Sequence, residues 1–179
     1  MNQVTEKQSI RELSSLSHGH RGSDGDGVNL TRLIGNKDLN MLDPFLLLDF
    51  FESDQPNDYL GGFPEHPHRG FETVTYMLAG KMRHKDNVGN EGVISANGVQ
   101  WMTAGKGIIH SEEPHAEFQK TGGRMHGFQI WVNLPARSKR AAPGYQYLPK
   151  ADIPVATSQD GLIKVTVIAG AVFGVSAAI

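Results

Sequence analysis

Short apolar segments separated by turn residues are the feature that most constrains the fold of this chain. Strand-like segments recur at intervals of about 8–12 residues, with glycine, asparagine or proline between them. The chain holds 21 Gly and 9 Pro among 179 residues, and no segment keeps a long 3.6-residue apolar period. This pattern predicts an all-β fold, either a sandwich or a barrel. The expected strands cover residues 28–34, 44–51, 72–79, 81–86, 92–95, 99–103, 107–112, 127–134 and 162–168.

Changes in composition divide the chain into three parts. Residues 1–27 are polar and end in a run rich in glycine and aspartate, so we expect a flexible N-terminal arm. Residues 28–150 hold most of the expected strands and form the expected main domain. A Pro-rich, charged stretch over 135–160 indicates a boundary, and residues 151–179 are expected to be a linker with remnant strands of a second domain.

The composition also excludes several classes of protein. Cysteine is absent, which excludes disulfide scaffolds, iron–sulfur clusters and thiol catalysis. Lys and Arg number 17 against 19 Asp and Glu, so the chain lacks the basic excess of a nucleic-acid binder. The first residues have no apolar core of a secretory signal, and the longest apolar run is too short to span a bilayer. We therefore expect a cytoplasmic protein without membrane contact or direct contact with nucleic acid.

Two histidine motifs carry the candidate chemistry. His66 and His68 are two residues apart, and His110 and Glu112 repeat that spacing. In a strand, residues i and i+2 point to the same face, so two such pairs on neighbouring strands could bring three imidazoles and a carboxylate together. Imidazole and carboxylate donors without thiolate suit Fe(II), Mn, Ni, Cu or Zn. The sequence predicts a transition-metal site, and Glu72, which has the same parity as the first pair, could join it.

Five segments of the chain, taken in order, resemble the pirin family of the cupin superfamily. They are LDPFLLLD from Leu42, HPHRGFETVT from His66, QWMTAGKG from Gln100, HSEE from His110 and QIWVNL from Gln129. The resemblance covers residues from about 30 to 167. It implies a cupin double-stranded β-helix barrel, in agreement with the strand pattern. Because pirins have two stacked cupin domains, it also implies that the second domain is truncated or missing here.

The resemblance further implies a ligand set and a metal. In pirins the carboxylate ligand lies two residues after the third histidine, which implies His66, His68, His110 and Glu112 as ligands. Iron is the usual metal of the family, so Fe(II) is expected, with another divalent transition metal as the alternative. Glu72, which corresponds to the carboxylate ligand of many other cupins, then becomes a residue behind the ligands or a structural one.

Two functions are compatible with this ligand set. Some pirins resemble quercetin 2,3-dioxygenases, which open a flavonol ring with dioxygen, and this implies a small aromatic substrate with Glu112 as the general base. Phe63, Phe71 and Met102 could line an apolar mouth, whereas Trp101 is expected in the core. Other pirins look like iron-dependent co-regulators that bind a protein partner without turnover. The residues alone do not separate the two.

The apolar C-terminal residues lead to a last expectation. The strand expected at 162–168 and the apolar tail at 169–179 would normally pack against a second domain. Exposed strand edges and apolar patches pair readily with another copy of the same chain. We therefore expect a homodimer, in which the C-terminal strand could be exchanged between the two copies.

Overall fold

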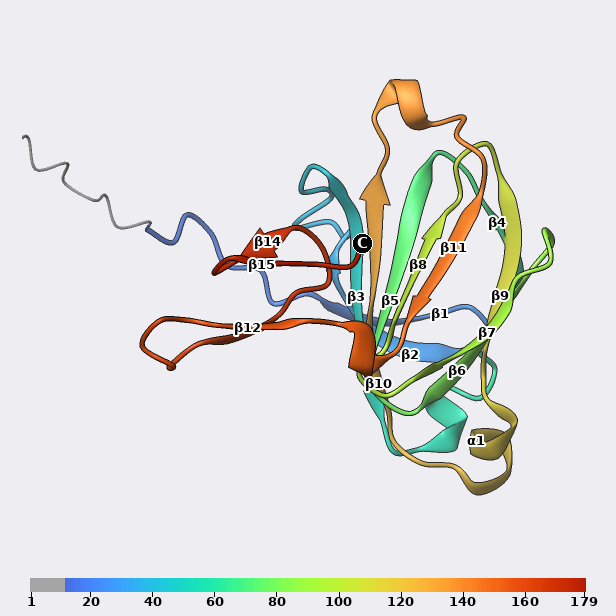
Figure 1. Ribbon diagram of the computed structural model, residues 1–179. Helices are drawn as coiled ribbons and strands as arrows, with labels where there is room; N and C mark the ends of the chain where they lie inside the picture. The colour runs from blue at the N-terminus through green and yellow to red at the C-terminus, as the bar shows by residue number, and fades with distance from the viewer. Residues whose placement is uncertain (1–11) are drawn as a thin grey trace, which may run out of the picture.

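The computed structural model describes residues 12–179 and is built on two antiparallel sheets that face each other (Figure 1). One sheet has seven strands in the order β1-β2-β3-β10-β5-β8-β11, and the other has four in the order β4-β9-β6-β7. The all-β prediction is confirmed. The seven strands, in sheet order, are His20–Asp24, Val28–Ile34, Phe45–Ser53, Met125–Asn133, Phe71–Ala79, Val99–Thr103 and Gly144–Leu148. The four are Phe63–His68, Ile108–Pro114, Lys81–Asp86 and Glu91–Ser95.

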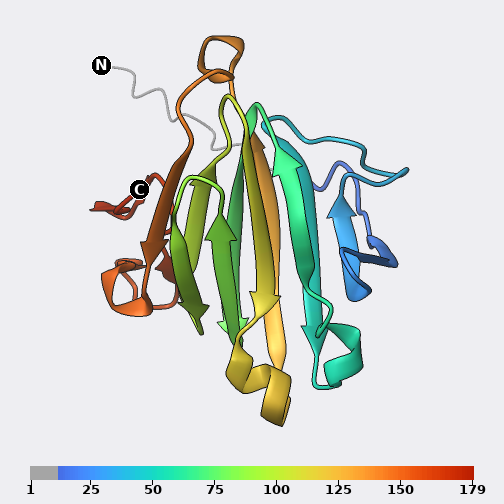
Figure 2. The same cartoon turned by 90° about the vertical axis from the view of Figure 1, so that its right-hand side faces the viewer.

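Apolar side chains from both sheets fill the space between them at one end. Phe51 and Met77 of the seven-stranded sheet pack with Met82 and Ile94 of the four-stranded sheet. Alternation along each strand directs every second side chain into this space. In β10, Gly127 is required because a Cβ atom there would lie 2.6 Å from a backbone oxygen of β5. Figure 2 shows the two layers from the side of the four-stranded sheet.

The C-terminal segments cover the outer face of the seven-stranded sheet (Figure 1). Ile153 is buried against Val74 and Val99, which point away from the space between the sheets, and Ile168 packs beside them. Two small hairpins follow, built from β12 (Val155–Thr157) with β13 (Lys164–Thr166) and β14 (Ala171–Val172) with β15 (Val175–Ser176). The helices are η1 (Pro56–Asp58), α1 (Ala116–Thr121), η2 (Ala136–Ser138) and η3 (Lys150–Asp152). Within residues 12–179, no helix is long and apolar enough to cross a membrane.

The structure corrects the expected organisation at both ends. The arm expected over residues 1–27 is wrong for His20–Asp24, which form β1 and pair with β2 in register from His20↔Arg32 to Asp24↔Val28. The strand forms through backbone pairing at a sheet edge, where exposed polar side chains are tolerated. The strand expected at 162–168 is shortened to β13, and β11 lies inside the Pro-rich stretch at 135–160. Residues 1–11 of the expected arm lie outside the described part.

Candidate metal centre

Strands β4 and β9 lie side by side and bring the two histidine motifs together. Their antiparallel register places His66 directly opposite His110. The i, i+2 spacing then directs His68 and Glu112 to the same inner face, on either side of this pair. His68, His110 and Glu112 are 7%, 1% and 2% exposed, so the motifs face the interior between the sheets. The parity argument from the sequence thus describes the observed arrangement.

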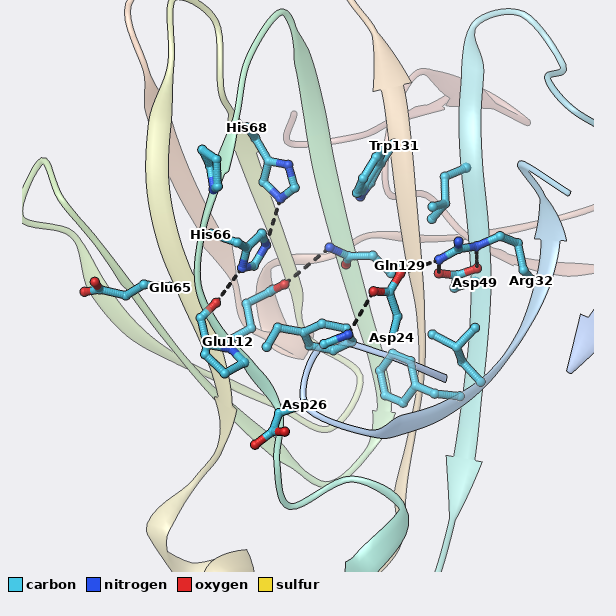
Figure 3. Close-up of a pocket in the computed structure, with 17 residues that line it drawn as sticks. Asp24, Asp26, Arg32, Asp49, Glu65, His66, His68, Glu112, Gln129 and Trp131 are labelled. Carbon is cyan, nitrogen blue, oxygen red and sulfur yellow. Dashed lines mark hydrogen bonds and ion pairs between the residues drawn. The ribbon is translucent and has the colours of Figure 1, made fainter. Parts of the chain in front are cut away.

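Three imidazole nitrogens converge at this point, and Figure 3 shows two of the rings, those of His66 and His68. The Nε2 atom of His66 lies 3.0 Å from Nε2 of His68 and 3.0 Å from Nε2 of His110. Across residues 12–179, these three histidines form the group whose ligand atoms lie close enough to hold a metal ion. Nitrogens this close together could all bind one ion at the usual metal–imidazole distance of about 2.1 Å.

The protonation of the imidazoles also fits a cation. His66 Nδ1 lies 2.7 Å from the Pro64 carbonyl oxygen, which can only accept, so Nδ1 donates, and in the neutral ring the lone pair is then on Nε2. Burial lowers the pKa of His68 to about 3, helped by His110 and His66, although Glu112 opposes the shift. Burial also lowers the pKa of His110 to about 3, with His66 acting in the same direction. Neutral imidazoles are the form that binds metal.

Glu112 lies beside the histidines but is held by other side chains. Its Oε1 atom accepts hydrogen bonds from Thr75 Oγ1 and Gln100 Nε2, both at 2.8 Å, and its Oε2 atom accepts a longer one of 3.3 Å from Gln129 Nε2. The carboxylate is therefore fixed by donors from three strands of the opposite sheet, and it is not one of the members of the histidine group. Its place as a fourth ligand stays a prediction.

A pocket of about 570 Å³ opens onto the histidines (Figure 3). His66, His68 and Glu112 lie in its wall together with the aromatic rings of Phe63 and Trp131. The Trp131 ring packs edge-on against His68, with ring centroids 5.1 Å apart. A pocket of this size, lined by both aromatic and charged or polar side chains, suits a small organic ligand that carries polar groups. The histidine group and the pocket therefore share one wall, to which His66 and His68 contribute.

The far wall of the pocket carries an ion-pair network. The Arg32 guanidinium donates to both carboxylate oxygens of Asp49, at 2.9 and 2.8 Å, and to Asp24 Oδ2 at 2.7 Å. These contacts raise the pKa of Arg32, with the Asp49 hydrogen bond as the main cause. One guanidinium thus faces two carboxylates, so this wall has no free positive charge for an anionic ligand and offers acceptors for hydroxyl groups.

The structure places the other predicted residues in different roles. Phe63 lines the pocket as expected, whereas Phe71 stands behind Trp131 at a centroid distance of 4.7 Å. Met102 belongs to a small buried cluster and Trp101 packs on the outer face of its sheet, so neither lines the pocket. The Glu72 carboxylate accepts a 2.6 Å hydrogen bond from Thr103 and does not line the pocket.

Two residues near the site were not predicted as part of it. Trp131 forms a wall of the pocket. The alternation of side chains along its strand could have predicted that Trp131 faces the interior. His84 is completely buried, and its Nδ1 atom lies 3.4 Å from Nδ1 of His110. The available signal was its spacing from Asp86, which repeats the i, i+2 pattern of the two motifs that were recognised.

Comparison with known proteins agrees with this architecture. A pirin-like protein of Caulobacter vibrioides is 59% identical over 162 residues, which are 90% of this chain and 57% of that protein. A solved quercetin 2,3-dioxygenase from Acinetobacter baumannii is 39% identical with a TM-score of 0.78, over 89% of this chain and 57% of that one. A bacterial pirin from Escherichia coli, solved with nickel(II), is 26% identical with a TM-score of 0.59, over 83% of this chain and 64% of that one.

These matches cover most of this chain but only part of each relative. The chain spans about half the length of the curated relatives it matches, from 44% to 57%. Its two facing antiparallel sheets agree with the expected cupin fold. The family model described as Pirin matches residues 27–132, which contain the three histidines and Glu112. The sequence motifs, the two facing sheets and the convergent imidazoles agree with that match. This chain therefore belongs to the pirin family.

Proposed function

We propose that this chain binds a divalent transition metal, with iron(II) as the expected one, and opens the ring of a flavonol-type substrate with dioxygen. The observation that carries the proposal is the shared wall: His66 and His68, two of the three convergent imidazoles, line a pocket of about 570 Å³ together with Glu112. The solved quercetin 2,3-dioxygenase and the nickel(II) pirin, both similar to this chain, support it. No anionic group on the substrate is required, because Arg32 is already neutralised.

His66, His68 and His110 would hold the metal through their Nε2 atoms. When bound, the metal supplies Lewis acidity and open coordination positions. Neutral imidazoles suit this role, and the low pKa values of His68 and His110, about 3, keep protons from competing near neutral pH. Phe63 and Trp131 would flank the aromatic rings of the substrate and exclude water from the reacting end of the pocket.

Glu112 would accept the hydroxyl proton of the flavonol. Its Oε1 atom already accepts two hydrogen bonds of 2.8 Å, whereas Oε2 accepts a single longer one of 3.3 Å. Oε2 therefore keeps lone-pair capacity and is the atom assigned to the proton transfer. Thr75 and Gln100 would hold the carboxylate in place during the transfer, so that the base does not have to reorganise.

The test measures metal content and quercetin consumption in the same preparations. The protein loaded with iron(II) should consume quercetin in air, and Glu112→Gln should retain metal at least in part while ring opening falls by about 10²- to 10⁴-fold, the usual contribution of a general base. The matched control is Glu72→Gln, since this carboxylate contacts Thr103 outside the pocket. It should change neither metal content nor turnover.

Two results would contradict the assignment. If Glu72→Gln loses the metal while Glu112→Gln keeps both metal and activity, the wrong carboxylate has been chosen. If the loaded protein binds metal stoichiometrically but does not turn over quercetin, the dioxygenase proposal fails, and a non-enzymatic, iron-dependent co-regulator that binds a protein partner becomes the better interpretation.

A further inference from the structure

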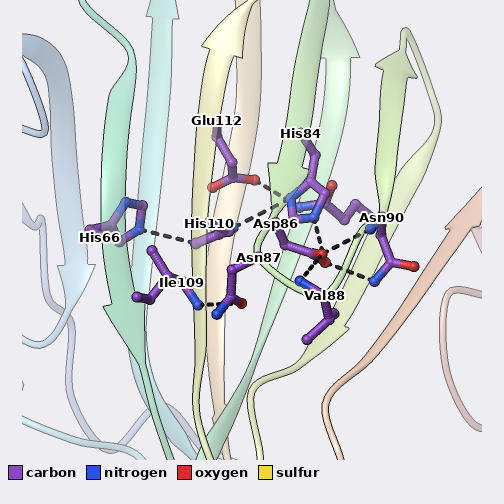
Figure 4. Close-up of polar contacts among 10 residues, drawn as sticks. His66, His84, Asp86, Asn87, Val88, Asn90, Ile109, His110 and Glu112 are labelled. Carbon is purple, nitrogen blue, oxygen red and sulfur yellow. Dashed lines mark hydrogen bonds and ion pairs between the residues drawn. The ribbon is translucent and has the colours of Figure 1, made fainter.

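A line of buried side chains runs from His110 of the histidine group to the neighbouring strand β6 of the four-stranded sheet (Figure 4). His84 and Asp86 of β6 lie opposite Glu112 and His110 of β9. His84 Nδ1 lies 3.4 Å from His110 Nδ1, and His84 Nε2 lies 3.2 Å from Asp86 Oδ2. The side chains of His84 and Asp86 are completely buried. The three residues thus form a line that runs away from the pocket, behind the metal group.

Asp86 anchors the far end of this line as an acceptor. Its Oδ1 atom accepts the backbone N–H groups of Val88 and Asn90, at 3.1 and 2.9 Å, and its Oδ2 atom accepts the Asn90 side-chain amide at 2.8 Å. Burial acts to raise the pKa of Asp86, but the hydrogen bonds from Asn90 and His84 outweigh it and hold the pKa below its usual value. Asp86 is therefore a carboxylate with no proton to give.

The direction of each hydrogen bond follows from that anchor. Because Asp86 only accepts, His84 Nε2 must donate to it, and a neutral His84 then has an unprotonated Nδ1. That lone pair faces His110 Nδ1, so His110 must carry its proton on Nδ1. The remaining nitrogen of His110, Nε2, keeps its lone pair, and this is the atom directed at His66 Nε2.

A stacked tyrosine holds the His84 ring in the required plane. The Tyr145 ring of β11 lies parallel to His84, with centroids 4.5 Å apart and an interplanar angle of 19°. Gly92 of β7 lies opposite His84, and a Cβ atom there would be 2.5 Å from the Tyr145 hydroxyl. The missing side chain at Gly92 thus leaves room for the tyrosine, which restricts the rotation of His84.

We infer that Asp86 and His84 are positioning residues that fix His110 in its Nδ1–H tautomer and so present Nε2 as a metal ligand. The role in metal binding rests on the proposed metal centre. The tautomer itself is a property of the protein without metal. Partners that set the tautomer of a ligating histidine typically change metal affinity by about 10- to 100-fold when they are removed.

The direct test is the tautomer of each ring in the unmodified protein. Long-range proton–nitrogen NMR correlations on ¹⁵N-histidine-labelled, metal-free protein should show His84 protonated on Nε2 and His110 protonated on Nδ1. Zn(II), which is diamagnetic, should leave both unchanged. A His84 ring protonated on Nδ1 would overturn the inference. This measurement needs no metal, so it also tests the inference if the metal centre itself fails.

Substitutions at His84 separate tautomer control from packing. His84→Phe keeps a ring against Tyr145 but cannot accept from His110, and we expect Ni(II) affinity to fall by about 10- to 100-fold. His84→Gln can accept from His110 through its amide oxygen and donate to Asp86 through its amide nitrogen, so it should restore most of the affinity. The inference is overturned if His84→Phe binds Ni(II) as tightly as the unmodified protein, or if both variants are equally weakened.

A double substitution tests the role of Asp86 while preserving the hydrogen bonds of the turn from Asp86 to Asn90. In Asp86→Asn combined with Asn90→Asp, the amide at 86 still donates to a carboxylate at 90, and its oxygen still accepts the two backbone N–H groups. The amide of residue 86 now donates to His84 Nε2, so the proton of a neutral His84 moves to Nδ1. This N–H group would then face the Nδ1–H group of His110. Ni(II) affinity should fall about as far as in His84→Phe. Unchanged affinity in this double variant would show that Asp86 has no such role.

Discussion

The low pKa values of His68 and His110 predict that mild acid destabilises the metal-free protein. Both imidazoles have a pKa of about 3 in the folded protein, whereas histidine in an unfolded chain has a pKa of about 6.5. Above pH 6.5 the two states bind equal numbers of protons at these positions, and the histidines make stability independent of pH. Between pH 6.5 and about 3, only the unfolded chain binds them, so the free energy of unfolding falls as pH falls.

The size of the effect follows from the same values. Each pH unit below 6.5 lowers the free energy of unfolding by about 1.4 kcal/mol for each histidine. At pH 4.5, two units lower, this amounts to a little under about 3 kcal/mol per histidine and to between about 5 and about 6 kcal/mol for the pair. A domain of this size is usually stable by about 5–15 kcal/mol, so the two buried rings alone would remove a large part of the stability. The upper part of this window, from pH 6.5 down to about 5, lies above the usual carboxyl pKa values of about 3.9 for Asp and about 4.3 for Glu, so the histidines dominate the slope there.

Urea unfolding curves at several pH values between 7.5 and 4.5 would measure this slope. The matched control is the double variant His68→Gln with His110→Gln, which has no imidazole at either position. It should be less stable at pH 7.5, because buried polar groups lose their partners, but its stability should fall less steeply with acid. Equal slopes in the two proteins would refute the assignment of the low pKa values. Ni(II)-loaded protein should resist acid until the metal dissociates, because binding stabilises the folded state.

Two further predictions concern residues around the pocket and the stacked ring. Tyr145→Phe should stabilise the protein by about 1 kcal/mol in urea unfolding, because the buried Tyr145 hydroxyl has no hydrogen-bond partner among residues 12–179. A clear loss of stability would mean that the hydroxyl is satisfied, for example by a buried water molecule. Gly61→Ala should raise the KM for quercetin and leave bound Ni(II) unchanged, because its Cβ atom would collide with the Asp26 backbone oxygen and displace the loop that lines the pocket. An unchanged KM would show that this loop does not contact the substrate.

The strands that the sequence predicts best are those with both alternation and clear turn residues. The expected segments at 28–34, 81–86 and 99–103 match β2, β6 and β8. The segments that were missed have weaker local signals. β1 is polar because it lies at a sheet edge, and it is held by backbone pairing with β2. Such an element depends on its neighbour, so local composition describes it as a loop.

The grouping of the three histidines could be predicted because a period of two is a local property. His66 and His68 share a face whatever the sheet around them, as do His110 and Glu112, and only the pairing of their strands had to be assumed. The direction of the Glu112 carboxylate could not be predicted. It depends on Thr75, Gln100 and Gln129, which reach it from β5, β8 and β10 of the opposite sheet.

The order of the strands explains why the sequence alone does not identify His84 and Asp86 as part of the site. His84 and Asp86 have the same i, i+2 spacing as the two recognised motifs, but alone they look like part of a charged strand, KMRHKD. Only the order β4-β9-β6 shows that the three motifs occupy adjacent strands and face the same interior. His110 lies in the middle, with His66 on one side and Asp86 on the other. In this arrangement β9 supplies the shared ligand, β4 completes the metal group, and β6 sets the proton on the far nitrogen. The central position of β9 would therefore couple the proposed metal centre to the anchored turn after β6.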